Sequence, residues 1–276
     1  MSVALSVRAL AKRYGDLQAL HDVSFELSSG ELIAVVGPNG AGKTTLLSIV
    51  AGSTEPSGGS FEVSSGRVGW APQRVAVYSR LSVRENLELF AHLERVEDPR
   101  AAADRMLEQT ALAPRADELL AHLSGGNRQR VNVALALIAK PAVLALDEPT
   151  AALDPGQRER LWEFIMGLVE GGAAVLYSTH NVSEVRRHAR RVLVLDEGEL
   201  CLDATPAELL AAGGEPPDGD LERALVRFLR GGPGAGDGEV TGAGPGPGSG
   251  GEGTGAGPGG GEGTGAGPGG GEGTGG

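Results

Sequence analysis

The chain has 276 residues, and 36 acidic against 24 basic side chains give it a formal net charge of −12, which disfavours nucleic acid as a partner. No apolar run approaches the roughly 18 to 20 residues of a membrane span, and the N-terminus lacks the basic start and apolar stretch of a signal peptide, so we expect a cytosolic protein. The single cysteine, Cys201, excludes an internal disulfide, and its alternating neighbours predict a packed strand residue.

Two stretches of alternating apolar residues near the N-terminus predict two strands of an antiparallel sheet with one buried face. They cover residues 3–7 and 23–27. Tyr14 lies between them, beside a turn at Gly15. An exposed aromatic at this place is predicted to stack on a purine ring, and the alternative is an ordinary tyrosine at a sheet edge.

A phosphate-binding loop follows the apolar strand predicted at residues 32–36. The loop fits the pattern G-x-x-x-x-G-K-[ST] and reads Gly37, Pro38, Asn39, Gly40, Ala41, Gly42, Lys43, Thr44. Its glycines let backbone N–H groups point at phosphate oxygens, and the following helix adds its positive dipole end. Lys43 is predicted to reach the β- and γ-phosphates and the Thr44 hydroxyl to hold Mg²⁺, so the expected ligand is a nucleoside triphosphate. The alternative is a glycine-rich turn that matches by accident.

A helix at residues 43–51 and strands near residues 61–63 and 68–70 lead to Gln73. This long amide follows a strand end, a location where α/β sheets place groups that contact ligands. After it, a mostly helical insert is predicted at about residues 74–140.

The insert contains three predicted helices with recognisable starts. The first two begin with a capping box at residues 82–85 and with Asp-Pro at residues 98–99. The third begins at Ser124, which is followed by Gly125 and Gly126, where a backbone can approach an anion. The insert therefore carries a second potential phosphate site.

An acid pair, Asp147 and Glu148, ends the next predicted strand, at residues 143–146. Because a buried carboxylate is costly without a cation or hydrogen-bond donors, the pair predicts a nearby Mg²⁺ and a water to be activated. The alternative is an acid pair that caps the turn at Pro149.

A further apolar strand, residues 173–177, delivers His180 to the same edge of the sheet, where it can meet a phosphate. The other four histidines, including His92, are expected to be structural. Between the two strands, Asp154 begins a helix with an apolar stripe, and Trp162, just off that stripe, is expected to pack.

The C-terminal part of the chain changes composition at residue 231. Before it, a hairpin around residues 197–198, a helix capped at residues 205–208 and an apolar stripe at residues 221–229 are predicted. After it, more than half of the residues are Gly, and Lys, Arg and aromatic residues are absent. Such a segment cannot bury enough apolar surface to offset its ordering entropy. We expect one folded domain at residues 1–230 and a disordered tail of Gly, Pro and Glu at residues 231–276.

Taken in order, these motifs resemble those of the nucleotide-binding subunits of ABC transporters, and the resemblance covers residues 1 to about 215. It implies an α/β fold with a P-loop NTPase core, in which a mostly parallel sheet with flanking helices is joined by an N-terminal antiparallel sheet and a small helical insert. It also implies ATP and Mg²⁺ as cofactors and ATP hydrolysis as the reaction.

The resemblance assigns the first motifs to nucleotide binding. Tyr14 is then the aromatic that stacks on adenine, and residues 37–45, which end at Thr45, are the Walker A loop. Gln73 corresponds to the Q-loop, and residues 123–129 correspond to the signature sequence.

The later motifs are assigned to nucleotide binding, through Asp147 and Asp154, and to metal binding and chemistry. Asp147 is the Walker B aspartate, Glu148 the general base, and His180 the switch histidine; residues 152–154, which end at Asp154, are the D-loop. The implied ligands of Mg²⁺ are Thr44, Gln73 and Asp147, and the implied catalytic groups are Glu148, His180 and Gln73.

Two positions depart from the family pattern. Asn127 stands where the family usually has Gln in its signature, and Leu135 stands where many members have Arg. Neither departure removes a catalytic group. Residues 134–137, together with residues 81–91, resemble drug-exporter ATPase subunits more than nutrient importers, which implies export of a small molecule or drug.

The resemblance also implies partners. Two copies are expected to form a head-to-tail homodimer, in which Ser124, Gly125 and Gly126 of one copy close over the nucleotide held by the other. A separate membrane-spanning permease is the second implied partner, which places the chain on the inner face of the cell membrane.

Three other functions stay open at this point. A soluble ABC-type ATPase acting on nucleic acid or ribosomes is disfavoured by the acidic balance and the single domain. An importer ATPase is the second alternative. A non-catalytic nucleotide-binding regulator is the third, and the presence of Glu148 and His180 argues against it.

Overall fold

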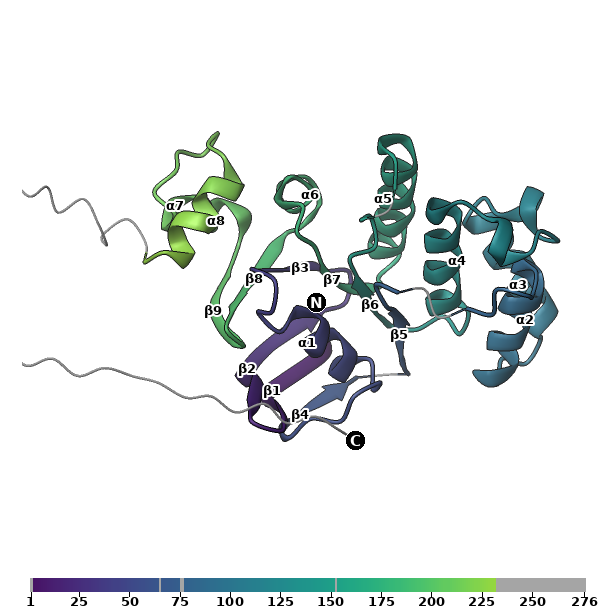
Figure 1. Cartoon of the computed structure of the whole chain (residues 1–276), viewed down its shortest axis with the longest axis horizontal. Helices are drawn as coiled ribbons and strands as arrows, with labels where there is room; N and C mark the ends of the chain where they lie inside the picture. Colours follow the sequence, from purple (N-terminus) through teal and green to yellow (C-terminus); the bar gives the residue numbers. More distant parts are fainter. Residues whose placement is uncertain (1, 65, 75–76, 152, 232–276) are drawn as a thin grey trace, which may run out of the picture. The chain divides into compact units, whose positions relative to one another are not determined.

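The computed structural model describes residues 2–64, 66–74, 77–151 and 153–231 (Figure 1). Contacts divide the chain into two units, residues 1–236 and 237–276, and everything described belongs to the first. The tail predicted at residues 231–276 lies, apart from Gly231, outside the described residues, and its disorder stays a prediction from the sequence.

The central sheet has six strands in the order β5-β6-β7-β3-β8-β9. Their bounds are Val68–Ala71 (β5), Val143–Asp147 (β6), Ala174–Ser178 (β7), Leu32–Val36 (β3), Arg191–Asp196 (β8) and Glu199–Ala204 (β9). All neighbours pair in parallel except β8 and β9, which form the predicted hairpin. The inner strands are continuous apolar runs because both of their faces are covered. The predicted mostly parallel sheet is confirmed.

A smaller antiparallel sheet has the strand order β2-β1-β4, with bounds Val3–Tyr14 (β1), Leu17–Ser28 (β2) and Gly58–Val63 (β4). The predicted N-terminal antiparallel sheet is therefore confirmed. The strands β1 and β2 are longer than predicted, with 12 residues each, because register shifts along their pairing absorb the breaks in the apolar alternation.

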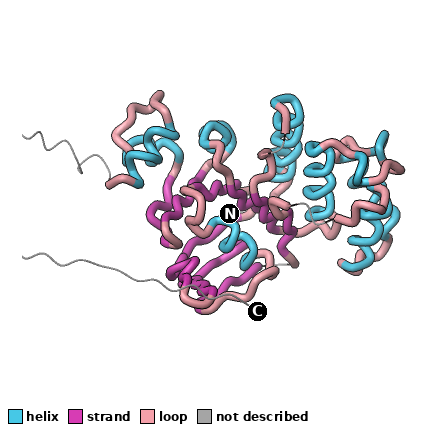
Figure 2. The backbone as a smooth tube through the Cα atoms, in the orientation of Figure 1, coloured by secondary structure: helices cyan, strands magenta, loops and turns pink. Residues whose placement is uncertain are grey.

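Eight α-helices lie in the described part of the chain (Figure 2). Their bounds are Lys43–Val50 (α1), Val83–Leu93 (α2), Pro99–Gln109 (α3), Gly125–Leu137 (α4), Pro155–Glu170 (α5), Val182–His188 (α6), Pro206–Ala212 (α7) and Leu221–Leu229 (α8). The predicted capping box at α2 is confirmed: the Glu85 N–H donates to the Ser82 hydroxyl at 3.1 Å, and the Ser82 N–H donates to the Glu85 carboxylate at 2.7 Å. Within the described ranges, no helix combines the length and the apolar character that crossing a membrane requires.

Alternate residues of the central strands face two separate apolar clusters. In β3, Leu32 and Val36 belong to a cluster that includes residues of α4, α5 and α6. Ile33 and Val35 belong to a cluster that includes α1 and the antiparallel sheet. Figure 1 shows these two sets of elements on opposite sides of the central sheet. Because a shift of one residue would exchange the two faces, the register is fixed and the loops at the strand ends rest on a rigid base.

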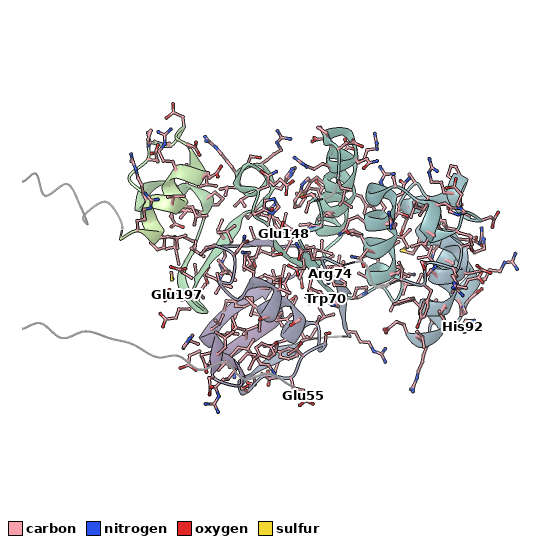
Figure 3. The ribbon with its side chains drawn as sticks, viewed as in Figure 1. Glu55, Trp70, Arg74, His92, Glu148 and Glu197 are labelled. Carbon is pink, nitrogen blue, oxygen red and sulfur yellow. The ribbon has the colours of Figure 1, made fainter. Side chains whose placement is uncertain are left out.

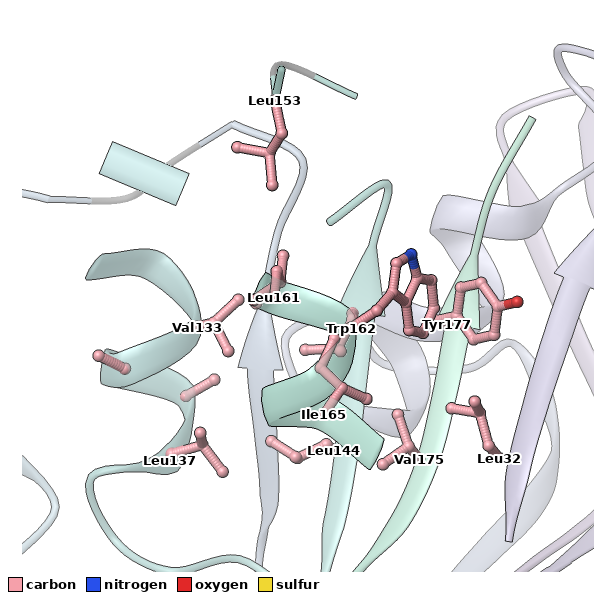
Figure 4. Close-up of a cluster of buried hydrophobic side chains, with 14 of the residues drawn as sticks. Leu32, Val133, Leu137, Leu144, Leu153, Leu161, Trp162, Ile165, Val175 and Tyr177 are labelled. Atoms are coloured by element: carbon pink, nitrogen blue, oxygen red, sulfur yellow. The ribbon is translucent and has the colours of Figure 1, made fainter. Parts of the chain in front are cut away.

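Trp162 occupies the cluster between α5 and β7 (Figure 4). It is 1% exposed, meets Tyr177 edge to face at 4.9 Å between ring centroids, and stacks on His188 at 4.4 Å. Its predicted packing role is confirmed. The prediction that Cys201 is packed is wrong, because Cys201 lies in β9 but is exposed. In this edge strand Leu200 and Leu202 are the partly buried neighbours, so Cys201 takes the outward side of the alternation.

Candidate active site

Three neighbouring parallel strands end at one edge of the central sheet, and predicted site residues follow them. The strand β3 leads into the loop that starts at Gly37, β6 ends at Asp147 and β7 ends at Ser178. Such an edge is where α/β sheets bind ligands. Figure 3 shows Glu148 at this edge and His92, which was predicted to be structural, away from it on α2.

The loop before α1 has the backbone that its glycines allow. The φ angles of Gly37, Gly40 and Gly42 are 147°, 86° and 98°, a region that favours glycine. At Gly37 a β-carbon would lie 2.0 Å from the Leu195 carbonyl oxygen, so the neighbouring strand also excludes a side chain. Because α1 begins at Lys43, its free N–H groups open toward the loop.

The Lys43 ammonium lies over this loop. Its Nζ donates to the carbonyl oxygens of Gly37 at 2.8 Å and Pro38 at 2.9 Å. Burial lowers the pKa of Lys43, and the negative charges of Glu148 and Asp147 oppose that shift. The cation is therefore held between the loop and the acid pair, where an anionic ligand finds a donor already in place.

Asp147 is buried, and both of its carboxylate oxygens accept hydrogen bonds. Thr44 Oγ1 donates to Oδ2 at 2.9 Å, and Ser178 Oγ donates to Oδ1 at 2.5 Å. The Ser178 hydroxyl also accepts the Glu148 N–H at 3.0 Å, so one hydroxyl links the two acids. No role was predicted for Ser178, whose only sequence signal is a hydroxyl at the end of an apolar strand.

Glu148 pairs directly with His180. Its Oε2 lies 2.7 Å from His180 Nδ1. The Glu148 side chain is 10% exposed and that of His180 is 67% exposed, so the acid is shielded while the histidine stays open to a ligand. The Glu148 backbone has φ 50°, which is uncommon for a residue with a β-carbon. The sequence predicted both residues at this edge but not their pairing.

A cavity of about 340 Å³ contains many of the predicted site residues of this edge, but His180 is not among its lining residues. It is lined by Tyr14, Asn39, Gly40, Gly42, Lys43, Thr44, Thr45, Gln73, Asp147 and Glu148, together with Leu17, Gln18 and Ala19. The last three were not predicted, because nothing in the sequence marks the start of β2 as a neighbour of the loop. Tyr14 is 48% exposed and carries the Lys12 ammonium 4.8 Å from its ring centroid.

The residues of the predicted signature lie elsewhere. Ser124 caps α4, where its hydroxyl accepts the Asn127 N–H at 3.4 Å. Gly126 packs against Gln157, because a β-carbon at Gly126 would lie 1.8 Å from Gln157 Oε1. Neither glycine of the signature, Gly125 or Gly126, nor Ser124 lines the cavity of its own chain.

Asp154 also lies outside the cavity lining, at the start of α5. Its Oδ1 accepts the Gln157 N–H at 2.8 Å, so this carboxylate caps the helix as predicted. Ala152, the first residue of the predicted D-loop, lies outside the described residues.

The two departures from the family pattern both lie on α4. Asn127 is in the first turn, and Leu135 is buried with 7% exposure. Leu135 lines a second cavity of about 510 Å³, together with Trp70, Pro72 and Phe90. Neither departure lines the cavity at the strand edge.

The oxygen atoms of three side chains in the cavity are suitable ligands for Mg²⁺. Thr44, Gln73 and Asp147 offer hydroxyl, amide and carboxylate oxygens, which are the hard ligands that Mg²⁺ prefers. In the ranges that the structure describes, no group of three or more His, Cys, Asp or Glu side chains is arranged to hold a metal. The donor set therefore fits a Mg²⁺ ion that shares its ligands with nucleotide phosphates.

Comparison with known proteins gives consistent matches. A family model described as ABC transporter matches residues 20–151. The daunorubicin resistance ATP-binding protein DrrA3 of Streptomyces coeruleorubidus is 38% identical over 235 residues, which covers 80% of this chain and 74% of that protein. The Nod factor export ATP-binding protein I of Burkholderia thailandensis is 36% identical over 224 residues, which covers 76% of this chain and 74% of that protein.

Solved structures agree with these matches. The fold is similar to that of an ATP binding subunit of an ABC transporter, with a TM-score of 0.72 and 26% identity, covering 82% of this chain and 99% of that one. It is also similar to the dimeric ATP-binding cassette MJ0796 in a post-hydrolysis state bound to ADP and Pi. That match has a TM-score of 0.66 and 26% identity, and it covers 73% of this chain and 98% of that one.

Proposed function

The chain belongs to the ABC transporter family as an ATP-binding subunit, and from this premise we propose that it hydrolyses ATP to power the export of a small molecule or drug through a separate permease. The observation that carries the proposal is the Glu148–His180 pair, 2.7 Å apart, next to the Lys43 loop. Export is supported by relatives named for daunorubicin resistance and Nod factor export.

In the proposed reaction, the loop binds the phosphates, and Glu148 and His180 act on the attacking water and the γ-phosphate. Lys43 and the N–H groups of residues 39–42 bind the β- and γ-phosphates, and Tyr14 stacks on the adenine. Glu148 takes a proton from water as the new bond to the γ-phosphorus forms and the bond to the ADP oxygen breaks. The exposed side chain of His180 contacts the γ-phosphate and stabilises the negative charge of that phosphate.

Mg²⁺ is the proposed metal, with Thr44, Gln73 and Asp147 as its protein ligands. When bound, it would neutralise charge on the phosphate oxygens. The Ser178 hydroxyl, 2.5 Å from Asp147 Oδ1, keeps this carboxylate oriented toward the cavity.

A head-to-tail homodimer completes the proposed site. In one chain, Ser124 and Gly126 do not line the cavity that contains Lys43. In the dimer, Ser124, Gly125 and Gly126 of one copy contact the γ-phosphate held by the other copy. The proposal is supported by the similarity of the fold to a dimeric cassette with bound ADP and Pi.

The proposed permease is tested by co-expression. The chain should be recovered in the membrane fraction when it is produced together with a candidate multi-span permease, and Glu148→Gln should be recovered there equally well. Transport by the reconstituted pair should stop in the Glu148→Gln variant. A chain that stays out of the membrane fraction in the presence of that protein would contradict this partner.

Hydrolysis is tested by Glu148→Gln in the purified full chain with Mg-ATP. The variant should bind ATP as the wild type does and release phosphate about 10² to 10⁴ times more slowly, because that is the usual loss when a general base is removed. Glu159→Gln is the matched control, since this acid lies on α5 with 55% of its side chain exposed. Near-normal phosphate release by Glu148→Gln overturns the proposed role of the acid.

A further inference from the structure

Glu184 is a buried acid for which the proposed reaction gives no use. It lies on α6, close behind His180 in the chain, and it is 4% exposed. Removing a carboxylate from water is costly unless hydrogen bonds or a cation compensate. The groups that compensate show what this carboxylate holds in place.

Three side chains donate hydrogen bonds to the Glu184 carboxylate. Thr150 Oγ1 donates to Oε2 at 2.9 Å, and Thr179 Oγ1 donates to the same oxygen at 3.4 Å. Asn181 Nδ2 donates to Oε1 at 3.3 Å. Thr150 and Thr179 are themselves buried, with 3% and 1% exposure, so their hydroxyls depend on this acceptor.

These donors flank the proposed catalytic pair. Thr150 follows Glu148 after a single intervening residue, and Thr179 and Asn181 stand on either side of His180. The Glu184 carboxylate therefore joins the chain segment that carries the acid to the segment that carries the histidine. Glu184 itself does not line the cavity that contains Lys43 and Glu148.

Arg158 on α5 supplies positive charge to the same cluster. Its Nε lies 3.4 Å from Glu184 Oε1, yet this N–H makes no hydrogen bond within the described residues. Arg158 therefore balances the charge, and the hydroxyl and amide donors fix the direction of the carboxylate. The Arg158 Nη2 donates to the Leu153 carbonyl oxygen at 3.4 Å, which ties the segment before Asp154 to the cluster as well.

We propose that Glu184 is a positioning residue for ATP hydrolysis, one that fixes the segments carrying Glu148 and His180 and thereby sets the distance between their side chains. The proposal rests on the roles proposed for those two residues. Positioning matters because the rate of the reaction depends steeply on geometry: a displacement of a catalytic group by about 1 Å can lower the rate about 10²-fold.

Glu184→Gln is the first test, because it keeps the volume of the side chain. A glutamine amide replaces one accepting oxygen by a donating nitrogen. When its oxygen stays with the two threonine hydroxyls, its nitrogen faces Asn181 Nδ2 and Arg158 Nε, which are themselves donors. The variant should therefore lose half of its anchoring contacts. We expect kcat for Mg-ATP to fall about 10- to 100-fold, with KM for ATP within about threefold of the wild type, because the residues that bind phosphate are untouched.

Thr150 offers a second test that does not alter a buried charge. Thr150→Val keeps the shape and removes the hydroxyl, and Thr150→Ser keeps the hydroxyl. The valine variant should lower kcat as Glu184→Gln does, and the serine variant should retain it. If both residues act through one bond, the double variant Glu184→Gln/Thr150→Val should lose less than the product of the two single losses.

The control is Glu159→Gln, which removes the exposed ion pair between Glu159 and Arg187, 3.2 Å apart, that also joins α5 to α6. It should leave kcat unchanged. Equal losses in Glu184→Gln and Glu159→Gln, or a kcat within about twofold of the wild type in Glu184→Gln, would overturn the inference. Where Glu184→Gln fails to fold, the comparison of Thr150→Val with Thr150→Ser decides, and equal activity of these two overturns it.

The wild type and Glu148→Gln are measured in the same assay. A wild type that does not hydrolyse ATP removes the proposed function, whereas an active Glu148→Gln removes the proposed role of that acid. The inference about Glu184 falls with either result. An active wild type and an inactive Glu148→Gln, together with an active Glu184→Gln, remove only the role of Glu184.

Discussion

At the scale of single residues, neutral hydroxyl groups hold the buried acids of this site. Asp147 is held by Thr44 and Ser178, and Glu184 is held by Thr150 and Thr179. A hydroxyl donor satisfies a carboxylate without neutralising it. At Asp147 this leaves the negative charge available for a metal ion, whereas at Glu184 the charge is balanced by Arg158.

Gly126→Ala separates the function of a signature glycine from its role in folding. The new β-carbon would lie 1.8 Å from Gln157 Oε1, the end of a flexible side chain that can swing away. We therefore expect a melting temperature close to that of the wild type. In the proposed dimer, the added methyl group and the displaced Gln157 side chain would crowd the contact with the other copy's phosphate, so ATP hydrolysis should be lost.

Gly69→Ala is the contrasting variant for this experiment. There the β-carbon would lie 2.2 Å from the backbone oxygen of Ala136, which cannot swing away, so the melting temperature itself should fall. Melting curves and phosphate release measure the two effects. A Gly126→Ala protein as destabilised as Gly69→Ala would contradict the distinction.

Residues whose roles depend on local backbone were predictable, and those whose roles depend on distant partners were not. The glycines of the 37–42 loop follow from a pattern within one short segment. Glu184, in contrast, is an acid in the first turn of a helix, where acidic side chains are usually exposed to solvent. Only the fold brings it to Thr150, 34 residues earlier in the chain.

At the scale of elements, the start of α5 offers a prediction about Asp154. Its carboxylate accepts the Gln157 N–H at 2.8 Å, and losing such a cap costs about 1 kcal/mol of stability. Asp154→Ala should therefore lower the free energy of unfolding in urea by about that amount, and Asp154→Asn, which caps equally well, should not. If Asp154→Asn retains stability but hydrolyses ATP slowly, the residue has a role in the reaction beyond capping.

The contact between α5 and α6 should make stability depend on pH through His188. Burial against Trp162, and then the charge of Arg187, lower the pKa of His188 below its ordinary value of 6.5, while Glu159 opposes the shift. The unfolded chain therefore binds the proton more readily. This contribution to stability is complete above pH 6.5 and is lost as pH falls from there toward the lower pKa of the folded state.

His188→Phe tests this dependence, because phenylalanine keeps an aromatic ring against Trp162 and does not titrate. Between about pH 7.5 and pH 5.5, the wild type should lose more unfolding free energy than the variant. Urea unfolding at several pH values measures the difference. Equal losses in both proteins would show that His188 keeps its ordinary pKa.

Elements with local signals were predicted well, and their arrangement was not. The capping box of α2 and the apolar run of β3 can each be recognised from a few consecutive residues. The position of β3 between β7 and β8 is set by packing of segments far apart in the chain. Cys201 shows the same limit on a smaller scale, because alternation in β9 does not reveal which side faces the interior.

At the scale of the whole molecule, the signature residues Ser124 to Gly126 do not line the cavity that contains Lys43, and the proposed dimer, which would bring the two together, can be tested. Mg-ATP should convert Glu148→Gln from monomer to dimer in light scattering, because a ligand that binds the closed dimer more tightly than the monomer stabilises the dimer. Mg-ADP should not, since it lacks the γ-phosphate that Ser124 would contact. Adding Ser124→Arg should keep the Mg-ATP sample monomeric. A Ser124→Arg protein that dimerises normally with ATP contradicts the model of sites shared between copies.

The left-handed backbone at Glu148 lowers the stability of the fold at a residue that is proposed to be required for ATP hydrolysis. A residue with a β-carbon in this conformation costs about 1 to 2 kcal/mol, a noticeable part of the 5 to 15 kcal/mol that usually separates a folded domain from its unfolded state. Glycine at this position would remove that cost, asparagine would reduce it, and both would remove the proposed base. Mutants enriched for heat resistance alone should therefore accumulate these two residues at position 148, and a population that must also transport should keep the strained glutamate.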